Sequence, residues 1–267
     1  LAQYYENNGQ YQDAVRLTRR AIFAAQQGYF PEILYRWQWQ MGRLLGKEGD
    51  TERAVGYYRD AIATLNPIRM EFFNGFRDRK KIFDEKVRPL YLNLAELLLE
   101  QAENSDSDPE DLQSDAYRSA RDTMELLKKA ELQNFFRDEC LTARERTPGM
   151  SGHIPSRTAV IYPIPLPDRL ILLLMLPDRM RHVSVPVRSE DLGRTAGKFR
   201  EQLEEAEEDF SDNAMRLYDW LIRPAESEFA SRETETLLIA PEGPLRMIPF
   251  SALHDGEHFL IETYALG

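Results

Sequence analysis

The sequence predicts an α + α/β protein in which helical hairpins precede an α/β sheet. In the first half, apolar and small residues recur at spacings of three and four, which place them on one face of a helix. From residue 157 onward the apolar residues instead form short runs that end at Pro and Asp turn signals, a pattern typical of strands. We therefore expect a helical region first and a sheet region second.

Residues 1–67 contain an internal repeat with an offset of 40 residues. Each copy has a predicted first helix, a Gly, and then a second helix with small and bulky residues at spacings of four and three. In the second helices, Ala14, Thr18 and Ala21 match Ala54, Tyr58 and Ala61. In the first helices, Ala2 and Tyr5 match Gly42 and Leu45. The glycines that follow the first helices, Gly9 and Gly49, also match.

This pattern resembles the tetratricopeptide repeat (TPR), in which small residues let two helices pack closely. The offset exceeds the usual ~34 residues of that repeat, so we expect longer helices or an insertion near Gln26–Pro31. Pro67 lies where such a repeat ends. A plain pair of helical hairpins is the alternative interpretation.

The TPR resemblance implies a curved surface that displays side chains of the first helices. Four such side chains in the second repeat have no assigned role in close packing: Tyr35, Gln38, Trp39 and Arg43. We expect some of them to line a groove that binds a protein or peptide partner. The alternative is that a neighbouring helix covers them.

Residues 68–141 are predicted to continue as a helical extension, followed by a linker at 142–156. One apolar stripe runs from Phe83 to Leu98, with Pro89 expected to kink its helix. Asn104–Pro109 is expected to be a mobile loop, and a second stripe runs from Ala116 to Ala130.

Residues 157–267 are predicted to form the sheet region. Three strands, Thr158–Ile164, Arg169–Leu176 and His182–Val187, are joined by short turns, which favours an antiparallel meander. Two amphipathic helices follow. Leu237–Ala240 is then expected to be a strand buried on both faces, and Phe259–Leu266 a further strand.

The segment 241–266 carries the most specific sequence pattern in the chain. It reads Pro-Glu-Gly-Pro, then Ile-Pro-Phe, Ala-Leu, Asp-Gly and Phe-Leu-Ile-Glu. This resembles the opening of a CHAT domain, a caspase-like cysteine-peptidase module usually found behind TPR repeats. The resemblance implies that 157–267 is the N-terminal part of such a domain, truncated before its catalytic dyad. It also implies an open sheet edge that pairs with the complementary C-terminal half of the domain.

No catalytic residue and no cofactor or metal site is predicted within the chain. Cys140 is the only cysteine, and it precedes the whole sheet region, so we expect it to pack at a helix end. His254 and His258 flank the turn dipeptide Asp255-Gly256, so their spacing does not place them on one helix face. Six carboxylates in Glu201–Asp209 are expected to be a solvated helix face.

The composition disfavours nucleic acid and membrane as partners. The formal net charge is −11, and an acidic surface repels phosphate backbones. The longest apolar run, Leu170–Leu176, is far shorter than the ~20 residues of a membrane-spanning helix. A single cysteine fits a reducing compartment, which predicts a cytoplasmic location.

Three functions remain open from the sequence. The first is a TPR–CHAT protein whose repeats bind a partner and whose full-length parent is a caspase-like cysteine endopeptidase. The second is a non-catalytic interaction scaffold, a pseudo-peptidase. The third is a small-molecule enzyme of another α/β class, which no motif supports: the chain has no phosphate-binding loop and no dinucleotide fingerprint.

Overall fold

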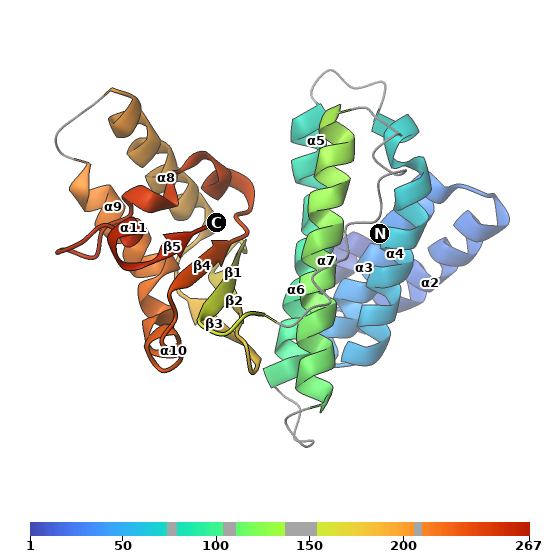
Figure 1. Cartoon of the computed structure of the whole chain (residues 1–267). Helices are drawn as coiled ribbons and strands as arrows, with labels where there is room; N and C mark the ends of the chain where they lie inside the picture. Colours follow the sequence, from blue (N-terminus) through green and yellow to red (C-terminus); the bar gives the residue numbers. More distant parts are fainter. Residues whose placement is uncertain (74–78, 104–110, 137–153, 206–209) are drawn as a thin grey trace. The chain divides into compact units, whose positions relative to one another are not determined.

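The computed structural model describes residues 1–73, 79–103, 111–136, 154–205 and 210–267. The chain divides into two units, Leu1–Thr147 and Pro148–Gly267. The first unit is helical and the second contains the sheet (Figure 1). The predicted α + α/β fold class is confirmed.

The helical unit begins with two antiparallel hairpins. They are formed by α1 (Ala2–Asn7), α2 (Tyr11–Gln27), α3 (Pro31–Lys47) and α4 (Thr51–Phe73). Gly9 and Gly49 have positive φ angles of 73° and 82° in the two hairpin turns, a conformation that glycine adopts without a steric penalty. Both α2 and α3 are 17 residues long and only residues 28–30 separate them. The long repeat offset thus comes from longer helices, and the alternative of an insertion near Gln26–Pro31 is wrong.

Small residues bring α3 and α4 close together, as the repeat pattern predicts. A Cβ atom on Gly42 would lie 2.8 Å from the ring of Tyr58, so only glycine fits there without a shift. Ala14 in α2 and Ala54 in α4 are completely buried. The helical hairpins are therefore confirmed, whereas the TPR resemblance itself remains an interpretation.

Prolines mark two corrections to the expected helices. The repeat end expected at Pro67 falls inside α4, which continues to Phe73. The expected kink at Pro89 is instead a break at Val87, between α5 (Arg79–Lys86) and α6 (Arg88–Glu103). Pro89 is then the second residue of α6, where a helix needs no backbone N–H donor.

The helical unit ends with α7 (Asp111–Phe136), which packs on α6. Its buried stripe includes Ala120 and Leu127, as the spacing predicts. The expected loop at Asn104–Pro109 lies outside the described residues, as do Cys140 and most of the expected linker at 142–156.

The second unit contains a five-stranded mixed sheet in the order β3-β2-β1-β4-β5. The strands are β1 (Thr158–Pro165), β2 (Leu170–Met175), β3 (Met180–Val185), β4 (Thr236–Ile239) and β5 (Ala265–Leu266). The pairs β1–β2 and β2–β3 are antiparallel, so the predicted meander is confirmed. β4 returns parallel to β1, and β5 lies parallel to β4.

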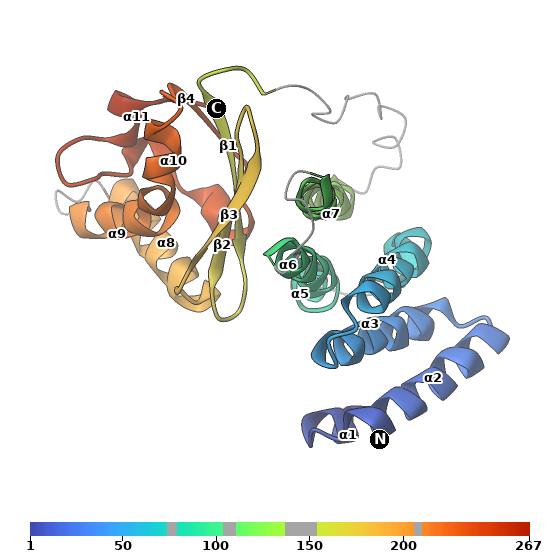
Figure 2. The ribbon, with the colours of Figure 1, turned by 90° about the horizontal axis from the view of Figure 1, so that it is seen from below.

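Helices cover one face of this sheet (Figure 2). They are α8 (Ser189–Glu204), α9 (Ser211–Leu221) and α10 (Glu226–Ala230), with a short 3-10 turn, η2 (Arg223–Ala225), before α10. Their apolar faces form one core with the strands, which includes Leu172, Phe199, Leu217, Phe229 and Leu237. The two amphipathic helices expected between the meander and β4 are thus confirmed as α8 and α9.

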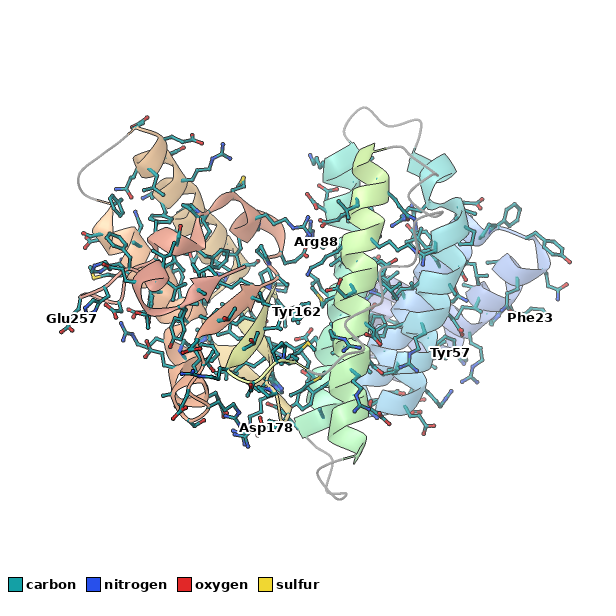
Figure 3. All side chains as sticks on the ribbon, viewed as in Figure 1. Phe23, Tyr57, Arg88, Tyr162, Asp178 and Glu257 are labelled. Carbon is teal, nitrogen blue, oxygen red and sulfur yellow. The ribbon has the colours of Figure 1, made fainter. Side chains whose placement is uncertain are left out.

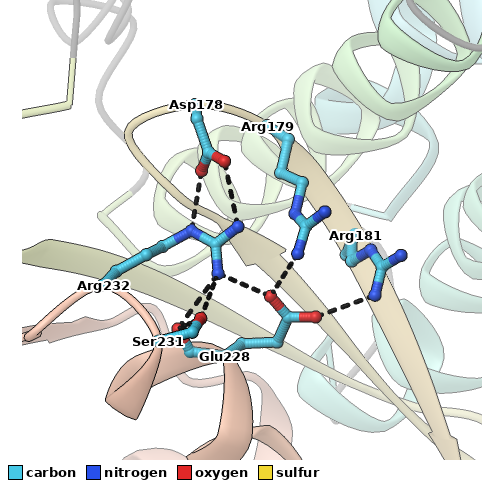
Figure 4. Close-up of polar contacts among 6 residues, drawn as sticks. All are labelled: Asp178, Arg179, Arg181, Glu228, Ser231 and Arg232. Atoms are coloured by element: carbon cyan, nitrogen blue, oxygen red, sulfur yellow. Dashed lines mark hydrogen bonds and ion pairs between the residues drawn. The ribbon is translucent and has the colours of Figure 1, made fainter.

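Ion pairs fasten the β2–β3 hairpin to α10 (Figure 4). The Glu228 carboxylate accepts hydrogen bonds of 2.8 Å from both Arg179 and Arg181, and one of 2.7 Å from Arg232. Arg232 also binds both carboxylate oxygens of Asp178. Burial alone would raise the pKa of Glu228, but the hydrogen bonds and positive charges of Arg179 and Arg181 outweigh burial and lower the pKa.

The C-terminal segment differs from the expected pair of strands. Leu237 is the only fully buried residue of β4, so a strand buried on both faces along its length is wrong. Two 3-10 turns follow, η3 (Gly243–Met247) and η4 (Phe250–Ala252). Phe259–Leu266 forms α11 (Leu260–Thr263) and then the short β5, because the Glu262 carboxylate accepts the backbone N–H of Phe259 and caps the first turn.

Candidate functional site

The first helices of the hairpins share a set of polar side chains. α1, α3 and α6 follow one another along one side of the helical unit, with α2, α4 and α7 behind them (Figure 2). We call the side chains that connect these three helices the first-helix surface: Glu6, Trp39, Gln40, Arg43, Lys47 and Asn93.

Glu6 on α1 is the centre of this surface. Its side chain is only 6% exposed, and its carboxylate accepts a hydrogen bond of 3.0 Å from the Gln40 amide. Arg43 donates two bonds of 3.3 Å, and the Lys47 ammonium lies 3.4 Å away. Burial would raise the pKa of Glu6, but the bonds from Arg43 and Gln40 and the two positive charges outweigh burial and lower the pKa. The Glu6 side chain therefore stays ionised and joins α1 to α3.

Trp39 and Arg43 extend the surface from α3 to α6. The Trp39 indole N–H donates a hydrogen bond of 3.2 Å to the side-chain oxygen of Asn93. The Arg43 guanidinium lies 5.2 Å from the Trp39 ring centroid, within the range of a cation–π contact. Both side chains are partly exposed and both are held in place, so they can contact a ligand with little loss of conformational entropy.

The four predicted groove residues divide into two pairs. Trp39 and Arg43 belong to the first-helix surface. Tyr35 and Gln38 are 1% and 7% exposed, so neighbouring helices cover them, as the alternative interpretation allows. The partner-binding role of all four residues stays a prediction, and the exposed positions are those of Trp39 and Arg43.

The exposed charges of the first-helix surface are positive. The side chains of Arg43 and Lys47 are 30% and 47% exposed, whereas the Glu6 carboxylate that they share is buried between them. One carboxylate cannot neutralise two cations. Arg43 and Lys47 can therefore each form an ion pair with a further carboxylate.

In the second unit, the loop after β4 contains a fully buried carboxylate. Glu242 is 0% exposed, and its side chain accepts a hydrogen bond of 3.1 Å from Arg246. Arg246 also donates to the carbonyl oxygen of Pro241. The pair therefore fixes the loop at the carboxyl end of β4. At this end of a strand that pairs in parallel, α/β proteins commonly place their functional groups.

The described residues do not bring a nucleophile and a base together. Cys140 and His153 lie outside them, so the predicted packing role of Cys140 is not addressed. His182 lies on the edge strand β3. His254 and His258 flank a turn in which the Asp255 carboxylate accepts the backbone N–H groups of residues 257 and 258, as the Asp-Gly signal predicts.

The loop around this turn projects outwards, with Glu257 at its tip (Figure 3). Within the described residues, no three His, Cys, Asp or Glu side chains gather in a way that could hold a metal ion. None of the described helices combines the length and apolar character that are needed to cross a bilayer.

Residues 211–267 match the family model of the CHAT domain. The match runs from α9 to β5 and includes the whole segment on which the sequence resemblance rests. No curated protein matches the chain. The match supports the predicted resemblance to a CHAT domain. CHAT is a caspase-like family, so the match is consistent with either a peptidase-related or a scaffold role.

Sequence reasoning missed four members of the first-helix surface: Glu6, Gln40, Lys47 and Asn93. Glu6, Lys47 and Asn93 come from three different helices, and no local spacing connects them. One signal in the sequence pointed to Glu6. At the 40-residue offset Glu6 corresponds to Gly46, a packing position of the next repeat. A carboxylate that is buried at such a position needs a hydrogen-bonding partner. Asn93 could not be found because it follows a helix break that the sequence pattern did not predict.

Proposed function

We propose that this chain is the partner-binding and sheet-forming part of a TPR–CHAT protein whose catalytic form is a caspase-like cysteine endopeptidase. The match of residues 211–267 to the CHAT family carries this proposal. The catalytic His and Cys would come from residues outside this sequence, because its only cysteine precedes the sheet unit. That single cysteine also suits a reducing, cytoplasmic setting.

In this proposal the first-helix surface binds the partner. The partly exposed Trp39 and Arg43 are of the residue types that most often dominate a binding interface, and Lys47 adds a second positive charge beside them. The buried Glu6 holds Arg43 and Lys47 in place before a partner arrives. We expect the partner to be a protein or peptide segment with acidic and apolar side chains.

A second partner would be the complementary C-terminal half of the CHAT domain. β5 is the last strand on its side of the described sheet, and it contains only Ala265 and Leu266. The outer edge of such a strand offers backbone donors and acceptors to another strand. In a caspase-like peptidase, that strand would belong to the part that carries the catalytic pair.

The second candidate function is a pseudo-peptidase scaffold. The observation that favours it is the first-helix surface, which is held in place by Glu6 and needs no catalytic pair to bind a partner. In this case the sheet unit would serve as a platform and the partner would be held without being cleaved. Both candidate functions require the first-helix surface to bind.

A peptide selection tests the binding role. Random peptides displayed on phage are selected against the purified chain, and the dissociation constant of the best peptide is measured by fluorescence anisotropy. We expect Trp39→Ala to weaken binding at least about tenfold, because it removes the central aromatic contact. Arg20→Ala is the matched control, since Arg20 is exposed on α2, a second helix, and should leave the constant unchanged.

Thermal unfolding must be recorded for each variant, because Trp39 also contacts Asn93. If Trp39→Ala is unstable, Trp39→Phe and Lys47→Gln replace it, since both keep most of the packing. Equal affinity in these variants and in Arg20→Ala would refute the assignment of the first-helix surface.

A further inference from the structure

The second unit contains a hollow of about 510 Å³ between α8, α9 and the segment after β3. It is separate from the loop after β4 and from β5. Pro186 and Arg188 form one wall, α8 contributes Arg194 and Lys198, and α9 contributes Arg216 and Trp220. A volume of this size suits one compact small molecule, because ligand pockets typically measure about 300–1,000 Å³.

The helical spacing explains why these side chains meet. Arg194 and Lys198 are four residues apart on α8, so they lie on the same face one turn apart. Arg216 and Trp220 have the same spacing on α9. The other faces of the two helices, with Phe199 on α8 and the apolar stripe of α9, fill the core beneath the sheet.

Positive charge is concentrated around this hollow. Its lining contains four cationic side chains and one carboxylate, Asp191. Arg194 is neutralised by Glu190 and Asp191, at 3.0 and 3.1 Å. Arg188, Lys198 and Arg216 are exposed, and none of them pairs with a carboxylate in the part of the chain that the structure describes.

Unpaired cations at one site are unexpected in a chain with a net charge of −11. Elsewhere in the same unit, exposed arginines are paired: Arg200 binds Glu204 at 2.7 Å, and Arg223 binds Asp219 at 2.5 Å. Three like charges around one hollow repel one another, and a bound anion relieves this repulsion.

The remaining lining can hold such an anion in a defined orientation. Trp220 is partly buried and packs against the core, so its position is fixed. Thr195 is buried at the wall and carries a hydroxyl group. Guanidinium groups bind phosphate oxygens in a bidentate geometry, and a lysine adds a point charge. A compact hollow with these groups fits clustered phosphates better than an extended acidic peptide.

We infer that this hollow binds a small molecule that carries two or more clustered phosphate groups. Arg188, Lys198 and Arg216 neutralise the phosphates, and Trp220 forms the wall against which the rest of the ligand lies. The site is independent of the first-helix surface. A bound anion would hold the α8–α9 pair and the segment after β3 together.

The test is calorimetric titration of the full chain with inorganic tripolyphosphate and with ATP, without added metal. We expect both to bind, and we expect Arg216→Gln and Lys198→Gln each to weaken binding about tenfold. Arg59→Gln is the matched control, because Arg59 is an exposed arginine on α4 without a carboxylate partner among the described residues. It should change the affinity less than about twofold.

Three results would overturn the inference. The first is no binding of either probe at about 1 mM. The second is an equal loss of affinity in Arg59→Gln and Arg216→Gln, which would show unspecific attraction. The third is that a short oligoglutamate binds as tightly as tripolyphosphate and that its binding is lost in the same variants. This result would assign the hollow to an acidic peptide. The three substituted side chains, Arg59, Lys198 and Arg216, are exposed, so each variant should keep the unfolding temperature of the parent chain. The unfolding temperature of each variant is measured together with its affinity.

Discussion

At the scale of single residues, the buried carboxylate of Glu6 joins α1 to α3. Glu6 is surrounded by Gln40, Arg43 and Lys47, so its ionised form is favoured in the folded chain despite burial. A carboxyl group with a lowered pKa stabilises the fold above the pKa that it has in the unfolded chain. That stabilisation is lost as the pH falls through the lower pKa of the folded state.

Glu6→Gln tests this role. At pH 7 we expect the variant to be about 1–3 kcal/mol less stable than the parent, because two cations lose their shared carboxylate. The difference should shrink as the pH falls below about 4.3, the ordinary pKa of Glu, because the parent's own carboxyl then protonates. Urea unfolding at a series of pH values measures both effects.

Asp122→Asn is the control for Glu6→Gln, since the Asp122 side chain is 61% exposed and forms an ion pair with its neighbour Arg121. It should cost less than about 1 kcal/mol at pH 7. A Glu6→Gln penalty that is no larger, or that grows as the pH falls, would contradict the assigned role of Glu6.

At the scale of elements, the hairpin between α3 and α4 is the most specific packing feature. Gly42→Ala places a Cβ atom 2.8 Å from the Tyr58 ring, and Tyr58 is buried and cannot move freely. We expect a loss of about 1–3 kcal/mol in the free energy of unfolding, despite the better helix propensity of alanine.

Gly56→Ala is the opposite case on α4. A Cβ atom there meets nothing within 4 Å, so only helix propensity acts, and we expect a gain of up to about 1 kcal/mol. Chemical denaturation of both variants gives the comparison. Changes of the same sign at Gly42 and Gly56 would show that close packing does not set the hairpin geometry.

Elements with a strong periodic pattern were predictable from the sequence, and elements set by a local contact were not. β1 and β2 were found because their apolar runs end at turns with Pro and Asp, and β3 because its valines alternate with polar residues. α11 was missed because one capping contact, from Glu262 to the backbone of Phe259, overrides a strand-like run. Pro67 was expected to end the repeat, but α4 continues through it to Phe73.

The candidate site was predictable in the same uneven way. Trp39 and Arg43 followed from the repeat register, because their positions on α3 are not needed for close packing. The burial of Tyr35 and Gln38 depends on neighbouring helices that no repeat pattern could place. The hollow between α8 and α9 escaped notice because its cations come from two helices and a loop that are individually unremarkable in charge.

At the scale of the whole molecule, two units of different kinds follow one another along the chain. A helical unit with a preorganised first-helix surface precedes a unit whose residues 211–267 match the CHAT family. The only cysteine, Cys140, comes before every strand of the sheet, whereas caspase-like catalysis needs a thiolate beside a base.

The most direct measurement is hydrolysis of a diverse peptide mixture by the purified chain, followed by mass spectrometry, with Cys140→Ala assayed in parallel. The account predicts that both proteins leave the peptides intact at the rate of the buffer control. Cleavage by the parent chain that disappears in Cys140→Ala would contradict it, because the chain would then contain its own nucleophile.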